Sequence, residues 1–149
     1  MKRIQSFNVD HDLIERGMYI SRIDGDITTF DMRTRKPNNG DYMDNVTMHS
    51  VEHMFATYIR NSEIGEKVIY FGPMGCRTGF YLLTRDLAPE TVLRETRKAL
   101  SSIVEHDGEM FGNTRKECGN YLELDLNKAK VEAKAYLDVL NSRNVDFKY

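Results

Sequence analysis

The chain has 149 residues, of which 40% are hydrophobic and 30% are charged, and its formal net charge is −2. This balance is typical of one folded domain, and a domain of this size buries a core without disulfide bonds. No long block of Lys and Arg is present, which argues against nucleic acid as a partner. No apolar run approaches the roughly 20 residues that cross a bilayer, and the N-terminal residues lack the apolar stretch of a signal peptide. We therefore expect a cytoplasmic protein without membrane contact, in which the two cysteines are free thiols or metal ligands.

The predicted elements mix strands and helices along a chain without repeats or linkers. In chain order they are a hairpin over residues 17–34, a loop over 35–46, a helix over about 47–61, strands over 67–71 and 78–84, a helix over about 89–106, and a last helix over about 126–142. The hairpin is indicated by alternating apolar residues around Asp24-Gly25. Either Thr47 or Asn45 is available as the N-cap of the first helix. The mixture predicts a single α+β domain over residues 1–149, with a mixed or antiparallel sheet packed against helices.

Apolar residues at helical spacing predict which helix faces turn inward. In the first helix this stripe consists of Met48, Val51, Phe55 and Ile59. In the last helix the inward residues are expected to be Val131, Tyr136, Leu137 and Leu140. The other face of the first helix is therefore free to carry polar chemistry.

The first helix contains the sequence His49-Ser50-Val51-Glu52-His53. Histidines four residues apart lie one turn apart on the same helix face, so both imidazoles can bind one metal ion. Glu52 lies beside them, where a carboxylate can transfer protons without being a ligand. The same spacing also occurs on ordinary solvated helices, so the pair alone does not establish a metal site.

A catalytic metal site of this kind uses three protein ligands and keeps one position open. His11 lies near the N-terminus, and His106 lies at the end of a predicted helix, where it can interact with the helix dipole. Cys118 lies in an irregular segment that can fold back onto the two histidines. Judged from the residues alone, Cys118 is explained equally well as a metal ligand and as a lone buried thiol.

The second cysteine, Cys76, lies in the turn between the two later strands, with Pro73 and Gly75 before it and Arg77 after it. Such a turn exposes backbone N–H groups and leaves room for a substrate. An adjacent cation or metal lowers the pKa of a thiol, and a thiolate in this place can act as a base or a nucleophile. The alternative is a turn cysteine without a chemical role.

Together these motifs resemble the LuxS family, the S-ribosylhomocysteine lyases, over nearly the whole chain. The five motifs that carry the resemblance are Ser6-Phe7-Asn8-Val9-Asp10-His11, Phe30-Asp31-Met32-Arg33 followed by Pro37-Asn38, His49-Ser50-Val51-Glu52-His53, Pro73-Met74-Gly75-Cys76-Arg77-Thr78-Gly79-Phe80-Tyr81, and Glu117-Cys118-Gly119. Each motif is weak by itself. Their order and spacing in a chain of this length make the combination specific.

The resemblance implies roles for residues that match the family's functional positions. His49, His53 and Cys118 would bind one divalent metal ion per subunit, with ferrous iron expected and zinc or cobalt as substitutes. Glu52 and Cys76 would be the general acid/base pair. Ligand types alone do not decide between iron and zinc, because both accept imidazole and thiolate.

The resemblance also implies a substrate, a reaction and an assembly. Ser6, His11 and Arg33 would contact the sugar of S-ribosylhomocysteine. Proton transfers would move the carbonyl of the opened sugar from C1 to C3, and β-elimination would then cleave the thioether. The products are homocysteine, which belongs to the methyl cycle, and 4,5-dihydroxy-2,3-pentanedione, the autoinducer-2 precursor of quorum sensing. The family forms homodimers with two active sites at the interface, and each site includes residues of the other chain.

One segment departs from the family pattern. Many members have Asp at the first of the three residues before the Pro-Met-Gly-Cys turn, where this chain has Tyr70-Phe71-Gly72. A lost carboxylate there would weaken recognition of the substrate ammonium group, unless another acid replaces it. The residues matched to metal binding and proton transfer are intact.

Two other classes of protein fit part of the sequence. An inverted-motif H-x-x-E-H zinc peptidase would use Glu52 to activate water, but such peptidases are longer chains and usually take a carboxylate as third ligand. A non-catalytic structural metal domain would leave Cys76 without a purpose. It would also need a fourth ligand that is not evident.

Overall fold

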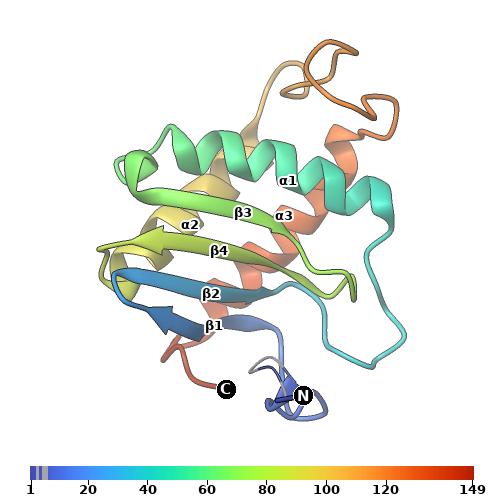
Figure 1. The fold of residues 1–149 in the computed structure, drawn as a ribbon. Coiled ribbons are helices and arrows are strands. Elements are labelled where there is room, and N and C mark those ends of the chain that lie inside the picture. The colour runs from blue at the N-terminus through green and yellow to red at the C-terminus, as the bar shows by residue number, and fades with distance from the viewer. Residues whose placement is uncertain (3, 5–6) are drawn as a thin grey trace.

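Four antiparallel strands form the sheet of the computed structural model, which describes residues 1–2, 4 and 7–149 (Figure 1). The strands are β1 (Gly17–Asp24), β2 (Ile27–Arg33), β3 (Val68–Pro73) and β4 (Gly79–Arg85), in the order β1-β2-β4-β3. The predicted hairpin is confirmed as β1 and β2, and Gly25 in its turn has φ +62°, which glycine adopts without strain. The sheet is therefore antiparallel throughout, as the α+β expectation allowed.

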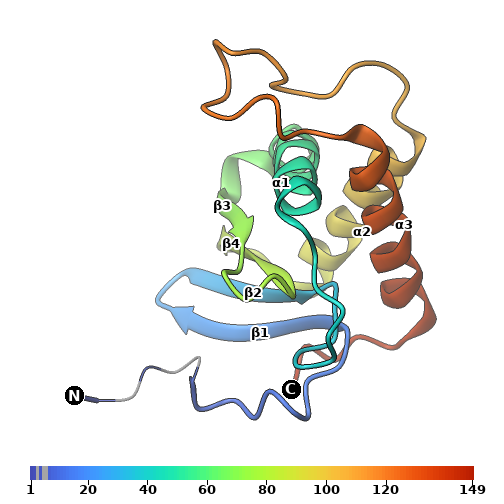
Figure 2. The ribbon, with the colours of Figure 1, turned by 90° about the vertical axis from the view of Figure 1, so that its right-hand side faces the viewer.

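Three helices lie on one side of this sheet (Figure 2). They are α1 (Asn45–Arg60), α2 (Pro89–Glu105) and α3 (Leu126–Ser142), and a short 3₁₀ turn, η2 (Gly65–Lys67), follows α1. The predicted N-cap of α1 was wrong, because the helix begins two residues earlier than expected. The cap is Asp44, whose Oδ1 accepts the backbone N–H of Thr47 at 2.7 Å. Within the described part of the chain, no helix has the length and apolar character needed to span a membrane.

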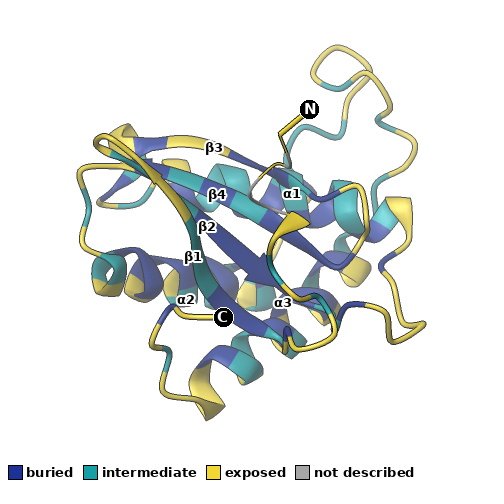
Figure 3. Ribbon diagram, turned by 60° about the horizontal axis from the view of Figure 1, so that its bottom comes forward, coloured by how far each residue is buried: buried dark blue, intermediate teal, exposed yellow. Residues whose placement is uncertain are grey.

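The core lies between the sheet and the helices (Figure 3). Its largest fully buried side chains include Phe30, Phe80 and Leu82 from the sheet, and Phe55, Ile59, Leu100, Ile103 and Tyr136 from the helices. The predicted inward stripe of α3 was wrong at Val131, which is 70% exposed. The inward face instead passes through Ala129, Ala133, Tyr136 and Leu140, which are spaced at four, three and four residues. The small alanines let α3 pack closely against α1 and α2.

Because side chains alternate along a strand, β2 presents Phe30 and Met32 to the helices and Asp31 and Arg33 to the opposite face. Asp31 and Arg33 are nonetheless buried. The C-terminal residue Tyr149 helps to cover them, because its hydroxyl donates to Asp31 Oδ2 at 2.8 Å. Among the residues that the structure describes, no helix covers this second face of the sheet (Figure 2).

Candidate metal centre and thiol site

The structure brings His49, His53 and Cys118 together. The two histidines lie one turn apart on α1, and the loop between α2 and α3 folds over that helix to deliver the cysteine (Figure 1). One ligand atom from each residue lies within 4.8 Å of the others, and Cys118 Sγ is 3.4 Å from His49 Nε2. All three side chains are half-buried, so the cluster remains reachable from solvent.

Hydrogen bonds fix the orientation of both imidazoles. Nδ1 of His49 is 3.1 Å from the carbonyl oxygen of Glu123, and Nδ1 of His53 is 2.9 Å from that of Phe111. A carbonyl only accepts, so each Nδ1–H donates and each neutral ring keeps its Nε2 lone pair free. Metal-ligating histidines usually donate their second N–H in this way.

The loop that delivers Cys118 is tied to α1 at its far end. The hydroxyl of Ser50, which is fully buried, accepts the backbone N–H of Asp125 at 2.8 Å. Asp125 is also the N-cap of α3, since its side chain accepts the N–H of Lys128. The start of α3 is therefore fixed against the helix that carries both histidines. The backbone N–H of Asn120 donates to Cys118 Sγ at 3.4 Å.

Glu52 lies beside the cluster on α1 but is not one of its three members. Its side chain is half-buried, and among the described residues it forms no hydrogen bond or ion pair. A carboxylate that is not engaged elsewhere can accept a proton and return it.

Cys76 occupies the turn between β3 and β4 and is in contact with two polar side chains. Its Sγ lies 3.0 Å from Thr78 Oγ1, and Arg33 Nη1 donates to it at 3.7 Å. Burial raises the pKa of the Cys76 thiol, but the hydrogen bond of Thr78 and the charge of Arg33 outweigh it, so the pKa lies below its ordinary value. The cation at the thiol is Arg33 and not the adjacent Arg77, whose guanidinium lies 5.6 Å from the centre of the Tyr42 ring.

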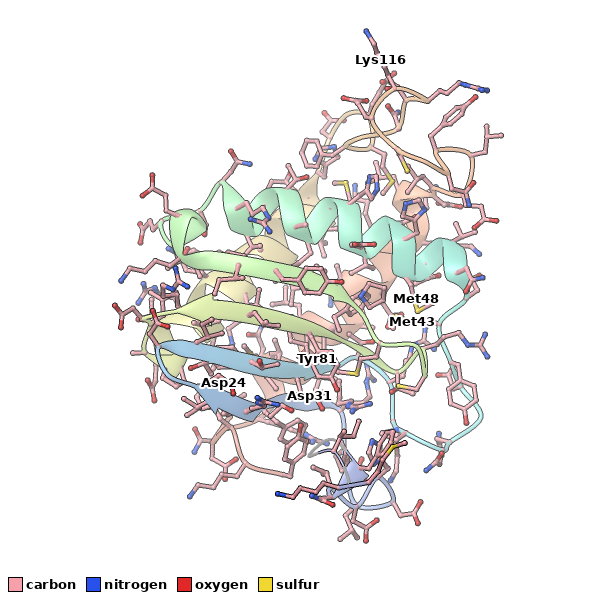
Figure 4. All side chains as sticks on the ribbon, in the orientation of Figure 1. Asp24, Asp31, Met43, Met48, Tyr81 and Lys116 are labelled. Atoms are coloured by element: carbon pink, nitrogen blue, oxygen red, sulfur yellow. The ribbon has the colours of Figure 1, made fainter. Side chains whose placement is uncertain are left out.

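Sequence reasoning missed the support of Arg33. Its Nη2 donates to Asp31 Oδ2 at 2.9 Å, its Nε lies 2.8 Å from Asp31 Oδ1, and its Nη1 donates to Thr78 Oγ1 at 2.7 Å. Figure 4 shows Asp31 next to Tyr81 on the sheet face that turns away from the helices. The only sequence signal was that Asp31 and Arg33 are two residues apart on one strand and thus share a face.

Ser6 and His11 are the other two residues expected to contact the sugar. Ser6 lies outside the described residues. His11 is half-buried, and its Nδ1 is 2.9 Å from the carbonyl oxygen of Val9. In the described part of the chain, no hydrogen bond or ion pair joins His11 to Cys76 or to the three clustered ligands. Among the described residues expected to contact the sugar, Arg33 reaches the thiol.

The fold and these groups define a class of protein, a small α+β domain in which two histidines on a helix and a cysteine on a loop could hold a metal ion, with a second thiol of lowered pKa at a separate turn. The family model of S-ribosylhomocysteinase (LuxS) matches residues 4–146. The chain therefore belongs to the LuxS family.

Curated relatives agree with this assignment. The chain is 41% identical over 147 residues to an S-ribosylhomocysteine lyase of Finegoldia magna, covering 95% of this chain and 94% of the relative. It is 42% identical over 148 residues to that of Borreliella burgdorferi strain ZS7, with the same coverage. It is 42% identical over 156 residues to that of Phocaeicola vulgatus, covering 100% and 97%. These similarities support the lyase expectation and give no support to the zinc peptidase.

Proposed function

We propose that this chain is a metal-dependent lyase that cleaves the thioether of S-ribosylhomocysteine. The products would be homocysteine and 4,5-dihydroxy-2,3-pentanedione. The observation that carries the proposal is the cluster of His49, His53 and Cys118 in a chain that matches named lyases over almost its full length. Our proposal includes a role in the methyl cycle and in synthesis of the autoinducer-2 precursor, and a location in the cytoplasm.

The donor set suits a divalent transition metal. Two imidazole nitrogens and a thiolate favour iron, cobalt or zinc over magnesium or calcium, which prefer oxygen ligands. His49, His53 and Cys118 would hold the ion, with ferrous iron as the proposed metal and zinc or cobalt as substitutes. When bound, the ion supplies a Lewis acid that polarises a carbonyl oxygen.

The protein's own acid/base groups would be Cys76 and Glu52. Moving a carbonyl along a sugar requires a base to remove a proton from one carbon and an acid to return it to the next. Thr78 and Arg33 lower the pKa of Cys76, which favours the thiolate, the form that can act as a base. In the last step, removal of a proton next to the carbonyl supplies the electron pair that expels homocysteine thiolate as the carbon–sulfur bond breaks, and that thiolate then takes up a proton.

Binding of the sugar is assigned to Ser6, His11 and Arg33. Arg33 is the best supported of the three, because its guanidinium contacts Cys76 and any sugar oxygen held there would lie beside the thiol. The guanidinium is also fixed by Asp31, so it can orient a substrate without first ordering itself.

We also propose a homodimer with its active sites at the interface. The three helices cover one face of the sheet, and in the described part of the chain none covers the other (Figure 2). That second face carries Tyr70, which is 50% exposed, and the half-buried Tyr81. Aromatic residues are enriched where proteins associate. Sedimentation equilibrium tests this assembly: twice the mass of one chain is expected, and a monomer at working concentration would contradict it.

The direct test of the lyase proposal is an anaerobic incubation with S-ribosylhomocysteine. The protein is loaded with ferrous iron to one ion per chain, and free thiol is titrated over time. We expect catalytic release of homocysteine in amounts equal to the substrate consumed. A metal-loaded protein that releases no thiol would overturn the proposal, and hydrolysis of a peptide substrate by the same sample would favour the peptidase.

A further inference from the structure

Three aromatic rings form a cluster between α1 and the loop that follows α2. They belong to Tyr58, His106 and Phe111, and every pair meets edge to face. The ring centres lie 6.0 Å apart for Tyr58 and His106, 5.3 Å for Tyr58 and Phe111, and 4.8 Å for His106 and Phe111. None of these residues belongs to the proposed ligand set or acid/base pair. Edge-to-face contacts favour one relative position of the segments that carry the rings.

His106 links this cluster to all three helices. It caps the C-terminus of α2, and its Nε2–H donates to the carbonyl of Glu109 at 2.8 Å. Since Nε2 carries the proton, Nδ1 of the neutral ring accepts, and the hydroxyl of Tyr58 on α1 donates to it at 2.7 Å. The backbone carbonyl of His106 accepts from Nζ of Lys130 on α3 at 2.7 Å. The beginning of the loop is thus fixed at three points.

A few residues later, the same loop contacts one of the three clustered residues, His53. The carbonyl of Phe111 accepts the Nδ1–H of His53 at 2.9 Å. The next residue, Gly112, has φ +65°, and a Cβ there would lie 2.9 Å from His53 Nδ1. The loop backbone therefore passes directly against the imidazole, and a small displacement of the loop would change the hydrogen bond that orients this ligand.

We propose that Tyr58 and His106 are positioning residues for His53. They hold the loop of residues 106–112 so that the carbonyl of Phe111 fixes the tautomer of His53 and leaves its Nε2 directed at the ligand cluster. A partner of this kind also raises the basicity of the ligand, and loss of such partners typically weakens metal binding. This inference rests on the proposed metal centre and adds the residues that prepare one of its ligands.

The test compares zinc affinity of the metal-free protein and three variants by chelator competition. Tyr58→Phe keeps the ring and removes one hydroxyl, and we expect about tenfold weaker binding; His106→Ala should weaken it by about 10- to 100-fold. Tyr136→Phe is the matched control. It also removes one phenol hydrogen bond, which joins α3 to the carbonyl of Gly17 on β1 at 2.8 Å and involves neither α1 nor residues 106–112. Its affinity should be unchanged.

A second measurement needs no metal. Amide hydrogen exchange of residues 106–112 in the metal-free protein should be faster in Tyr58→Phe and unchanged in Tyr136→Phe. Unaltered zinc affinity or unaltered exchange in Tyr58→Phe would overturn the inference, and this variant decides the question if His106→Ala does not fold. Failure of the metal centre itself looks different: the unaltered protein would bind no zinc, and the inference would fall with it.

Discussion

Arg33 Nη1 lies 3.7 Å from Cys76 Sγ, although Arg33 ends strand β2 and Cys76, 43 positions later, lies in the turn between β3 and β4. The register of β2 and β4 produces this contact. Arg33 pairs with Gly79, so the end of β2 lies beside the turn that carries Cys76. The cation therefore belongs to the sheet rather than to the turn, so movement of the turn would not displace it.

Replacing Cys76 by Ala should abolish turnover and leave metal binding intact. The thiol is outside the cluster of His49, His53 and Cys118, so its loss removes a proton carrier and no ligand. Atomic absorption measures whether the variant still binds metal, and thiol release from S-ribosylhomocysteine measures its turnover. Substantial turnover by this variant would remove Cys76 from the mechanism.

Replacing Thr78 by Val should raise the pKa of Cys76. Val has nearly the same shape, but it cannot donate to the thiolate, so the anion loses a stabilising hydrogen bond. The folded protein holds this pKa below its ordinary value. In the variant, Cys76 should therefore lose its proton at a higher pH than in the unaltered protein. The alkylation rate of the peptide containing residue 76, followed by mass spectrometry against pH, reports the shift. Thr78→Ser keeps the hydroxyl and should titrate like the unaltered protein; a Val variant that does the same would refute the role of Thr78.

Replacing Glu52 by Gln should lower kcat by about 10²- to 10⁴-fold, the usual range for loss of a general acid/base group. Metal affinity should change little, since Glu52 is not a member of the ligand cluster. Single-turnover kinetics with fully loaded protein separate the two effects. A loss of activity that excess metal restores would mean that Glu52 acts on the metal and not on protons.

Replacing His53 by Ala should reduce metal content and thermal stability together, because binding to the folded state stabilises it. The difference in Tm should be large with metal present and small in a chelator, which serves as the internal control. His53 is only half-buried, so its removal leaves the core intact. A variant with normal metal content would exclude His53 from the ligand set.

Replacing Asp44 by Ala should destabilise the protein by about 1 kcal/mol, the usual cost of a lost N-cap. The pKa of Asp44 is lowered from 3.8 to about 2, mainly by its hydrogen bond with Lys128 and then by the Thr47 N–H. A lowered pKa means that this stabilisation is complete above about pH 4 and is lost as the pH falls toward 2. Urea unfolding at pH 7 and pH 2.5 checks both statements. Asp44→Asn retains an acceptor for the cap and should lose less, while equal losses would show that Lys128 and not the cap matters.

Local sequence patterns predicted the hairpin and all three helices within about two residues, because periodicity and turn residues act over short distances. They failed at Val131, where the stripe of α3 was set by small alanines that allow close packing. Local patterns also did not predict that a cation from strand β2, Arg33, contacts Cys76. That contact depends on the pairing register of β2 and β4, which a single sequence does not contain.

Within the proposed site, His49 and His53 were accessible to sequence reasoning because helix geometry alone places them together. The spacing of residues did not decide whether Cys118 is a metal ligand, because a loop has no fixed geometry. That assignment depended on the family resemblance. The partners of the imidazoles could not be predicted, because backbone carbonyls such as that of Phe111 carry no sequence signal.

The loop between α2 and α3 is anchored at both ends without any metal. His106 fixes its beginning against α1 and α3, and Asp125 fixes its end against Ser50. Cys118 lies on the stretch between these anchors. An ion bound by Cys118 and the two histidines would therefore order only this short stretch, and not the whole segment from His53 to Cys118. The loss of conformational entropy on binding is correspondingly small. If the proposed ligands bind an ion, we therefore expect it to enter or leave by movement of that middle stretch alone, so that metal exchange is a local event rather than an unfolding event.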